Sequence, residues 1–280
     1  MNTSNQSYKE LAIPYFKVVF EIIDQIMIKH QIPYYLIGAS AVALELLKSG
    51  IKPSRGTKDI DFAIMISSLY QFEDLSKDLD QKGFKKVKAP WTFYSDEYNI
   101  VIDLLPFGEI EENDTIHFTE RNIDLHVLGF KEVMASAVKV EIEEKVVNVP
   151  PLPGMIILKL VSWSDRPEER ENDLADILRI IEHYFDVEFD EIVEFHHDTF
   201  PEDSEIDKYL VGAEVIGRKA QSYLSESGSL SKRIKDVLST NLTDDIESKI
   251  CREWTRIKGW DLEYSIQILK AFEKGIMASN

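Results

Sequence analysis

A change in hydrophobic patterning at Val149–Gly154 constrains the fold of this chain more than any other feature. The segment reads VPPLPG, and three prolines with a glycine in six residues interrupt any helix or central strand. Before this segment, short strand-like runs alternate with helical ones, and after it nearly every apolar pattern has helical spacing. We therefore predict two domains, residues 1–150 with mixed strands and helices, and residues 151–280 built from helices alone.

The pattern of apolar residues also predicts the individual elements of both domains. In the first domain we expect helices over residues 8–30, 40–50 and 68–82. Strands are expected over residues 30–38, 60–66, 84–95, 99–107, 123–128 and 145–149, with 84–95 paired to 99–107 around the turn-like DEYN. In the second domain we expect helices over residues 154–164, 168–185, 204–224, 229–239, 243–256 and 261–277.

The composition excludes several classes of protein. A net charge of −18 over 280 residues repels nucleic acid at long range, which argues against general DNA binding but leaves room for a basic partner protein. No apolar run reaches the roughly 18 residues of a membrane span, and the N-terminus shows no signal-peptide pattern, so we expect a cytoplasmic protein without a membrane partner. Cys251 is the single cysteine, which excludes an intramolecular disulfide and a cysteine-based metal cluster.

An acidic stretch runs from Glu182 to Glu214, with twelve Asp or Glu residues against one Lys. We interpret it as a solvated linker or helix face. A metal site built from His196, His197 and Asp198 is a weaker interpretation, because adjacent residues on one element rarely converge on one ion.

Two aspartates begin an apolar strand in the stretch RGTKDIDF. Side chains alternate along a strand, so Asp59 and Asp61 point to one side while Ile60 and Phe62 point to the other. Two like charges on one side repel each other unless something neutralises them. Mg²⁺ is a hard ion that binds carboxylates together with phosphates and water, and this spacing suits a metal–nucleotide site, although D-x-D alone is common.

Two further segments add to this pattern. The turn Gly38–Ser40 (GAS) falls where a strand becomes a helix, and the N–H groups of a helix N-terminus bind phosphate. Ser40 can cap that helix, donate to a phosphate, or do both, and an ordinary capped turn is the alternative. Asp103 lies in the apolar run VIDLL, where a charge is costly unless it is paired or metal-bound. If its strand pairs beside Ile60–Ile66, three carboxylates could surround Mg²⁺.

The ordered motifs resemble a known family. GASAVAL, RGTKDIDF, IDLLPFG and LKLVSWSDRPEERENDLADI are similar to the motifs of AbiEii-like nucleotidyltransferases, within the DNA polymerase β-type nucleotidyltransferase superfamily, over residues 34–185. The resemblance implies an α+β fold: an N-terminal polymerase β-like nucleotidyltransferase mixed sheet with helices, followed by a C-terminal all-helical region. That helical region would complete the nucleotide site and could bind the acceptor. Mg²⁺ or Mn²⁺ is the implied cofactor, and an NTP such as ATP is the implied substrate.

The resemblance also implies roles for single residues. Asp59, Asp61 and Asp103 resemble the catalytic carboxylates and metal ligands, with Asp103 acting as base toward the acceptor hydroxyl or holding the metal beside it. The implied nucleotide-binding residues are Gly38, Ser40, Lys159, Arg166, Asp173 and Asp176. Among these, Gly38 and Ser40 resemble the phosphate-cradling turn, and Lys159 resembles the lysine that contacts the triphosphate.

The chain departs from the family pattern at two positions. Ala39 replaces a second glycine, so the turn is less free to take a positive φ, and Asn172 stands where the family has lysine. The second departure leaves open whether Asp173 or Asp176 is the functional acid. In the turn before the D-x-D strand, Thr57 and Arg55 are predicted to order the backbone rather than to do chemistry.

The residues themselves support a special role for Lys159. It interrupts the apolar run MIILKLV, so it needs an anionic partner, for which a triphosphate or Asp173 would serve. Lys159, Trp163 and Arg166 are spaced i, i+4, i+7 on one helix face, and Trp163 is expected in the core. Pro167 is expected in the first turn of the next helix.

Three functions follow from these patterns. The first is Mg²⁺-dependent transfer of a nucleoside monophosphate from an NTP to an acceptor hydroxyl of RNA, tRNA or protein. The family resemblance implies that this is an AbiEii-like toxin of a toxin–antitoxin or phage-defence system, with an antitoxin protein as partner. The second is a small-molecule transferase of the aminoglycoside type, which suits an acidic protein. The third is a non-catalytic acidic module that binds a basic protein. For an RNA acceptor, the nearly neutral segment from Ser231 onward is the expected contact surface.

Overall fold

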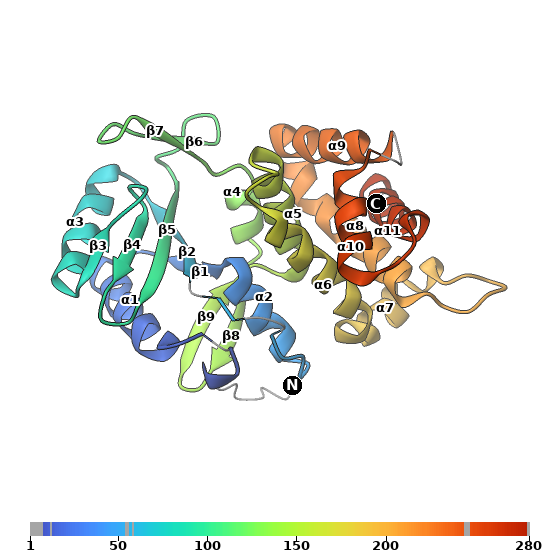
Figure 1. Ribbon diagram of the computed structural model, residues 1–280, viewed down its shortest axis with the longest axis horizontal. Helices are drawn as coiled ribbons and strands as arrows, with labels where there is room; N and C mark the ends of the chain where they lie inside the picture. The colour runs from blue at the N-terminus through green and yellow to red at the C-terminus, as the bar shows by residue number, and fades with distance from the viewer. Residues whose placement is uncertain (1–7, 12, 54–55, 58, 244–246, 279–280) are drawn as a thin grey trace. The chain divides into compact units, whose positions relative to one another are not determined.

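The computed structural model describes residues 8–11, 13–53, 56–57, 59–243 and 247–278. The chain divides into two compact units, Met1–Pro151 and Leu152–Asn280. The first unit contains all of the described strands together with several helices, and the described part of the second is helical (Figure 1). The predicted α+β class, a mixed sheet with helices followed by an all-helical region, is confirmed.

The first unit combines short helices with one larger sheet and two hairpins. Its helices are η1 (Tyr8–Leu11), α1 (Phe16–His30), α2 (Gly38–Leu47), α3 (Leu69–Gln81) and α4 (Phe130–Met134). Its strands are β1 (Tyr34–Ile37), β2 (Asp59–Ile66), β3 (Phe84–Lys86), β4 (Thr92–Ser95), β5 (Ile100–Gly108), β6 (Thr115–Phe118), β7 (Ile123–His126), β8 (Val138–Ile142) and β9 (Lys145–Val149).

The larger sheet is mixed and has the strand order β1-β2-β5-β4-β3. Strands β2 and β5 are parallel neighbours, whereas β1–β2, β5–β4 and β4–β3 are antiparallel. A parallel pair needs a crossover connection, and here α3, β3 and β4 supply it. The remaining strands form the separate hairpins β6–β7 and β8–β9.

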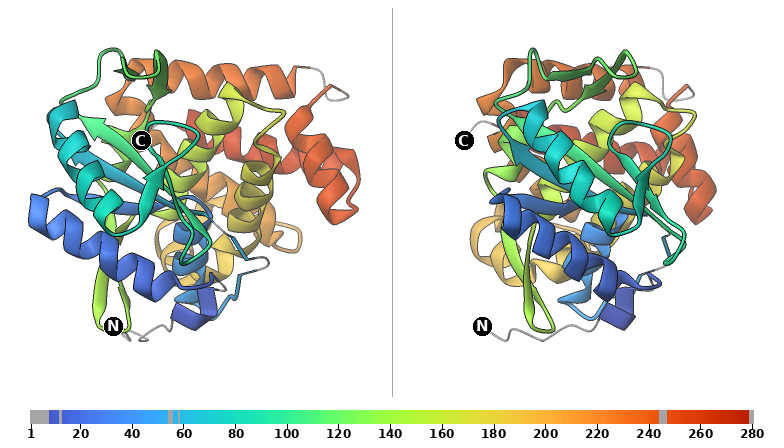
Figure 2. Two further views of the ribbon diagram at one scale, coloured as in Figure 1. Left: turned by 60° about the vertical axis from the view of Figure 1, so that its left-hand side comes forward. Right: turned by 90° about the vertical axis from the view of Figure 1, so that its left-hand side faces the viewer.

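Helices α1 and α3 cover one face of this sheet, as both views in Figure 2 show. The core between them is aromatic, with Phe20 of α1 packing 6.2 Å from Phe62 of β2, and Phe72 of α3 packing 6.3 Å from Phe93 of β4. The alternation of β2 explains this arrangement, because its even-numbered apolar residues all point to that face.

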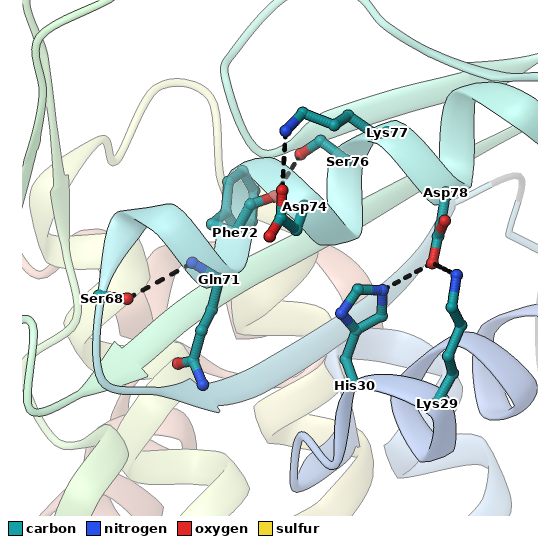
Figure 3. Close-up of polar contacts among 9 residues, drawn as sticks. All are labelled: Lys29, His30, Ser68, Gln71, Phe72, Asp74, Ser76, Lys77 and Asp78. Atoms are coloured by element: carbon teal, nitrogen blue, oxygen red, sulfur yellow. Dashed lines mark hydrogen bonds and ion pairs between the residues drawn. The ribbon is translucent and has the colours of Figure 1, made fainter.

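An ion-pair cluster joins the C-terminal ends of α1 and α3 (Figure 3). One oxygen of Asp78 lies 2.5 Å from Lys29 Nζ and 2.6 Å from His30 Nε2. Lys29, and then His30, hold the pKa of Asp78 below its ordinary value by hydrogen bonding to the carboxylate. The cationic end of α1 also suits a helix C-terminus.

Several predicted elements differ from the structure. The helix expected over residues 8–30 is wrong at its start, because Pro14 breaks it and the α-helix begins only at Phe16. The single strand expected over residues 84–95 is two strands, β3 and β4, separated near Pro90. Elements that the patterns did not predict include α4, β6 and β8, and α7 in the second unit, all of them seven residues or shorter.

The second unit consists of helices. They are α5 (Leu152–Asp165), α6 (Glu171–Val187), α7 (Phe189–Phe195), η2 (His197–Thr199), α8 (Lys208–Glu226), α9 (Gly228–Leu242), α10 (Lys249–Lys258) and α11 (Leu262–Met277). In the described part of the chain, no helix is both long enough and apolar enough to cross a lipid bilayer.

Two glycines allow α8 and α11 to pack backbone against backbone. A Cβ on Gly275 would lie 2.0 Å from the Glu214 carbonyl oxygen, and a Cβ on Gly217 would lie 2.2 Å from the Phe272 carbonyl oxygen. Neither backbone oxygen can move away without moving its helix. The closest helix contact of the second unit therefore depends on having no side chain at these positions.

We expect Gly275→Ala to lower the free energy of unfolding by about 3 kcal/mol or more, because the added methyl overpacks the helix contact. Gly228→Ala is the matched control, since a Cβ there meets nothing within 4 Å, and it should change stability by less than about 1 kcal/mol. Chemical denaturation followed by circular dichroism measures both values. Equal values for the two variants would contradict the close contact.

Candidate functional site

The candidate site is an acidic patch where β2 and β5 run side by side. Asp61 lies directly opposite Asp103 in the parallel register, and Asp59 lies opposite Val101. Residues opposite each other in neighbouring strands point to the same face, so the three carboxylates share one face of the sheet. Neighbouring strands are about 4.8 Å apart, and residues i and i+2 of one strand about 6.6 Å apart. The prediction that the strand of Asp103 pairs beside β2 is confirmed.

The other face of the same strands explains why the charges are tolerated. Ile60 and Phe62 are fully buried on the face of the sheet that α1 and α3 cover. Their burial holds β2 in place although its opposite face carries the carboxylates. Asp61 and Asp103 are half-buried, whereas Asp59 at the start of β2 is exposed. The patch is therefore partly shielded from water at its centre and open at the β2 entrance.

Thr92 is a member of this patch that sequence reasoning missed. It lies directly opposite Asp103 in the antiparallel β4–β5 pair, so its side chain points to the acidic face. Its side chain is buried, which places a hydroxyl next to the Asp103 strand position. The only signal in the sequence was the period-2 alternation of TFYS, and the register with β5 is a long-range property that the alternation does not reveal.

The turn between β1 and α2 closes against Asp61. Ile37, the last residue of β1, pairs with Asp61, and Gly38 follows it with φ +67°. A Cβ at position 38 would lie 2.1 Å from Asp61 Oδ2 and 3.2 Å from Asp61 Cβ, so any other residue would push the Asp61 side chain out of this position. The absence of a side chain therefore brings the N-terminus of α2 directly to the acidic patch. Ala39 does not have a positive φ, so the missing second glycine costs no backbone strain.

Ser40 does not cap α2, so the capping alternative that the sequence left open for Ser40 is wrong. The helix begins at Gly38, its N-cap residue is Ile37, and no side chain caps it. Ser40 is the third residue of the helix and is 1 % exposed, and its hydroxyl oxygen makes no hydrogen bond to the described residues. Its contact with a phosphate stays a prediction.

Thr57 orders the entrance of β2, as predicted. The Asp59 backbone N–H donates to Thr57 Oγ1 at 3.2 Å, and the Thr57 hydroxyl lies 3.2 Å from the Asp59 carbonyl oxygen. Arg55, which was expected to help order this turn, lies outside the described residues.

The acidic patch suits a hard cation in its ligand type but is not a finished three-ligand cage. Among the residues that the structure describes, no group of three or more His, Cys, Asp or Glu side chains is arranged to hold a metal ion. Mg²⁺ commonly binds through one or two carboxylates and completes its shell with substrate phosphates and water. The opposed pair Asp61 and Asp103 provides that kind of donor set. In the acidic stretch, Asp198 is bound by Arg218 at 2.8 Å, which weakens the alternative site there.

In the second unit, Lys159 joins the two acids of the later motif. Its ammonium lies 2.9 Å from Asp173 Oδ1 and 2.8 Å from Asp176 Oδ2, and the lysine is 7 % exposed. The prediction that Lys159 needs an anionic partner is confirmed, and α6 supplies it twice. Burial by itself lowers the pKa of Lys159, but Asp173 and then Asp176 outweigh it and hold the pKa above its ordinary value.

The neighbouring positions differ from expectation in part. Trp163 lies in the core at 5 % exposure, as predicted. Arg166 lies just beyond the end of α5, is exposed, and has Glu169 3.6 Å away. Pro167 does not begin the next helix, because α6 starts at Glu171 after a turn. The roles of Lys159 and Arg166 toward a nucleotide stay predictions.

A cavity of about 430 Å³ lies beside these residues within the second unit. Its lining residues are Trp163, Pro167, Glu168, Glu171, Leu174, Lys249, Arg252, Glu253 and Arg256. Three acids and three cations contribute, so the lining is close to neutral. This balance favours neither an anionic nor a cationic ligand.

Comparison with known proteins gives structural likenesses only. No protein-family model and no curated protein matches the chain. A nucleotidyltransferase-like antigenic protein from Paracoccidioides brasiliensis is similar at 15% identity over 83% of this chain and 95% of that one, with a TM-score of 0.40. The lincosamide adenylyltransferase LnuA, with lincomycin bound, is similar at 16% identity over 62% and 98%, with a TM-score of 0.37. The cyclic dinucleotide synthase CdnE from Elizabethkingia meningoseptica is similar at 9% identity over 95% and 93%, with a TM-score of 0.31. At these scores the likenesses do not decide what this chain does.

Gly38→Ala should damage the site more than a matched substitution at Gly50. Both glycines have positive φ, which costs alanine about 1–2 kcal/mol, but a Cβ at Gly50 meets nothing within 4 Å. At position 38 the clash with Asp61 should add about 1–3 kcal/mol. Thermal unfolding of the two variants gives the difference. If Gly38→Ala is no more costly than Gly50→Ala, α2 does not lie against Asp61 as described.

Lys159→Met should lower the free energy of unfolding by about 3–5 kcal/mol, because it removes the shared cation of the buried Asp176 and the half-buried Asp173. Lys208→Met is the matched control: its ion pair with Asp186 is more than half exposed and should contribute less than about 1 kcal/mol. Because the folded pKa of Lys159 is raised, its contribution is complete below the unfolded pKa of about 10.4 and is lost as pH rises through the folded pKa. The deficit of Lys159→Met should therefore stay constant from about pH 7 to pH 9 in denaturant titrations. A deficit no larger than that of Lys208→Met would contradict a structural role.

Proposed function

We propose that this protein transfers a nucleoside monophosphate from an NTP to an acceptor hydroxyl in the presence of Mg²⁺ or Mn²⁺. The observation that carries the proposal is the direct opposition of Asp61 and Asp103 on parallel strands, with the N-terminus of α2 against Asp61. Carboxylates beside a helix N-terminus combine the two features that a metal-bound triphosphate needs, oxygen ligands and backbone N–H donors.

Each residue of the patch has a distinct role in this proposal. Asp61 and Asp103, with Asp59 at the entrance, would hold the cation, which supplies positive charge to the phosphates when it is bound. The N–H groups at Gly38 and beyond would position the phosphate chain. Asp103 would take the proton of the acceptor hydroxyl, whose oxygen bonds to the α-phosphorus as the bond to the pyrophosphate oxygen breaks. The pyrophosphate then leaves.

The acceptor that we propose is an RNA or protein hydroxyl, in the manner of an AbiEii-like toxin paired with an antitoxin. The motif resemblance of residues 34–185 supports this choice. A small cationic acceptor of the aminoglycoside type is the second candidate, and the net charge of −18 favours it. Growth arrest on expression indicates the first, and antibiotic resistance on expression indicates the second.

Asp61→Asn and Asp103→Asn should each reduce transfer of label from an NTP to total RNA by at least about 100-fold, because each removes a charge that acts on the reacting phosphates. Asp96→Asn, at an exposed turn position before β5, is the matched control and should retain full activity. The assay uses Mg²⁺ with each labelled NTP, and with an aminoglycoside panel in place of RNA.

Calorimetry on the same proteins measures NTP binding directly, so it tests the proposed nucleotide site independently of which acceptor is used. Binding of NTP that requires Mg²⁺ and is lost in Asp61→Asn supports the site even when the acceptor is wrong. Absence of Mg²⁺-dependent NTP binding in the unaltered protein would refute the proposal and favour a non-catalytic binding module.

A further inference from the structure

A short helix in the second unit exposes large apolar side chains. Phe189, Val193 and Phe195 of α7 are 50 %, 42 % and 65 % exposed, and Ile206, in the segment before α8, is 46 % exposed. We call these four residues the α7 surface. Figure 1 shows α7 and the extended segment that follows it at one end of the helical unit.

The sequence of α7 explains why these side chains face water. Ile192 alone is buried in this helix. Phe189 and Val193 are spaced i, i+4 and lie on one flank of Ile192, while helical geometry places Phe195 on the other flank. A seven-residue helix with one buried anchor thus presents aromatic and aliphatic groups on both sides of that anchor. Among the described residues, the other large apolar side chains exposed in this unit are Ile257 and Met277, which lie on different helices.

The same segment carries acids that the fold does not neutralise. Glu191 is paired with Lys219 and Asp198 with Arg218, so part of the acidic stretch is structural. Within this segment, five exposed acids form no ion pair with the described residues, and all five lie within six residues in sequence of an apolar member of the α7 surface. These acids are Asp190, Glu194, Glu202, Asp203 and Glu205.

We propose that the α7 surface docks a basic amphipathic segment of a partner protein. Three of these exposed side chains share one seven-residue helix. Apolar side chains exposed close together favour an occupant with apolar side chains, since isolated exposed residues are common but clusters mark interaction sites. The surrounding acids select lysine and arginine on that occupant and speed its approach. A helix that alternates apolar and basic faces supplies both. Nucleic acid and anionic lipid have the wrong charge, and a second copy would bring acids against acids.

The experiment uses the full chain and two synthetic peptides of equal charge. One peptide is a Lys/Leu helix with an apolar face, and the other replaces every Leu by Ser. Isothermal titration should show binding of the Lys/Leu peptide and at least about tenfold weaker binding of the Lys/Ser peptide. Binding of the Lys/Leu peptide should weaken with salt, because exposed charges contribute to it.

Two substitutions with matched controls locate the binding. The double variant Phe189→Ser/Phe195→Ser should weaken binding of the Lys/Leu peptide at least about tenfold. Ile257→Ser, at an exposed apolar residue of α10, should leave that binding unchanged. The double variant Asp190→Lys/Glu194→Lys should also weaken binding of the Lys/Leu peptide. Its control, Asp96→Lys/Glu97→Lys, changes the net charge equally at an exposed turn of the first unit and should weaken that binding less.

Three outcomes would overturn the proposal. Equal binding of both peptides would mean that the acids act as a nonspecific polyelectrolyte. Unchanged binding in Phe189→Ser/Phe195→Ser would place the site elsewhere. Self-association in sedimentation velocity that Phe195→Ser abolishes would assign the surface to a second copy instead. Circular dichroism of each variant confirms that it is folded before titration.

Discussion

The parallel pairing of β2 with β5 is the constraint on which the candidate site depends. Its register puts Asp61 opposite Asp103, and the same register turns Ile60 and Phe62 toward α1 and α3. A slip of one residue would bury the acids and expose the core, so the hydrophobic face fixes the acidic face. The repulsion between the carboxylates is therefore offset by burial on the opposite side of the same strands.

Much of this site could be predicted because its signals are local. The D-x-D spacing places both aspartates on one face of a strand. An aspartate inside an apolar run indicates a charge that needs a partner or a metal ion to neutralise it. What could not be predicted is long-range. Thr92 joins the patch only through the β4–β5 register, and the close approach of Gly38 to the Asp61 side chain depends on the Ile37–Asp61 pairing. The predicted bounds of two elements were wrong because a single proline interrupts each of them, Pro14 before α1 and Pro90 between β3 and β4.

Lys159 shows how a local signal can be correct while its partner stays undetermined. The apolar run around it required an anion, and a triphosphate and an aspartate satisfied that requirement equally. In the folded unit two carboxylates meet the ammonium, Asp173 at 2.9 Å and Asp176 at 2.8 Å. A triphosphate contact at Lys159 would have to compete with both of these charged hydrogen bonds inside the folded unit. The geometry therefore supports a structural tie between α5 and α6 more strongly than it supports a nucleotide contact.

The acidic stretch was interpreted as a solvated linker or helix face from its run of charges. The seven-residue helix α7 inside it is too short to show a helical period in the sequence. The charge of the acidic stretch also determines how the net charge is distributed along the chain. Of the 18 net negative charges of the chain, 11 lie between Glu182 and Glu214, where twelve acids face one lysine. The remaining 247 residues carry only 7, so their long-range repulsion of an RNA acceptor is much weaker than the total suggests. A basic segment bound at the α7 surface would neutralise part of the acidic stretch, which carries most of the net charge of the chain. The negative charge of this protein is therefore concentrated in one stretch of its helical unit, where it bears on the partner of that unit.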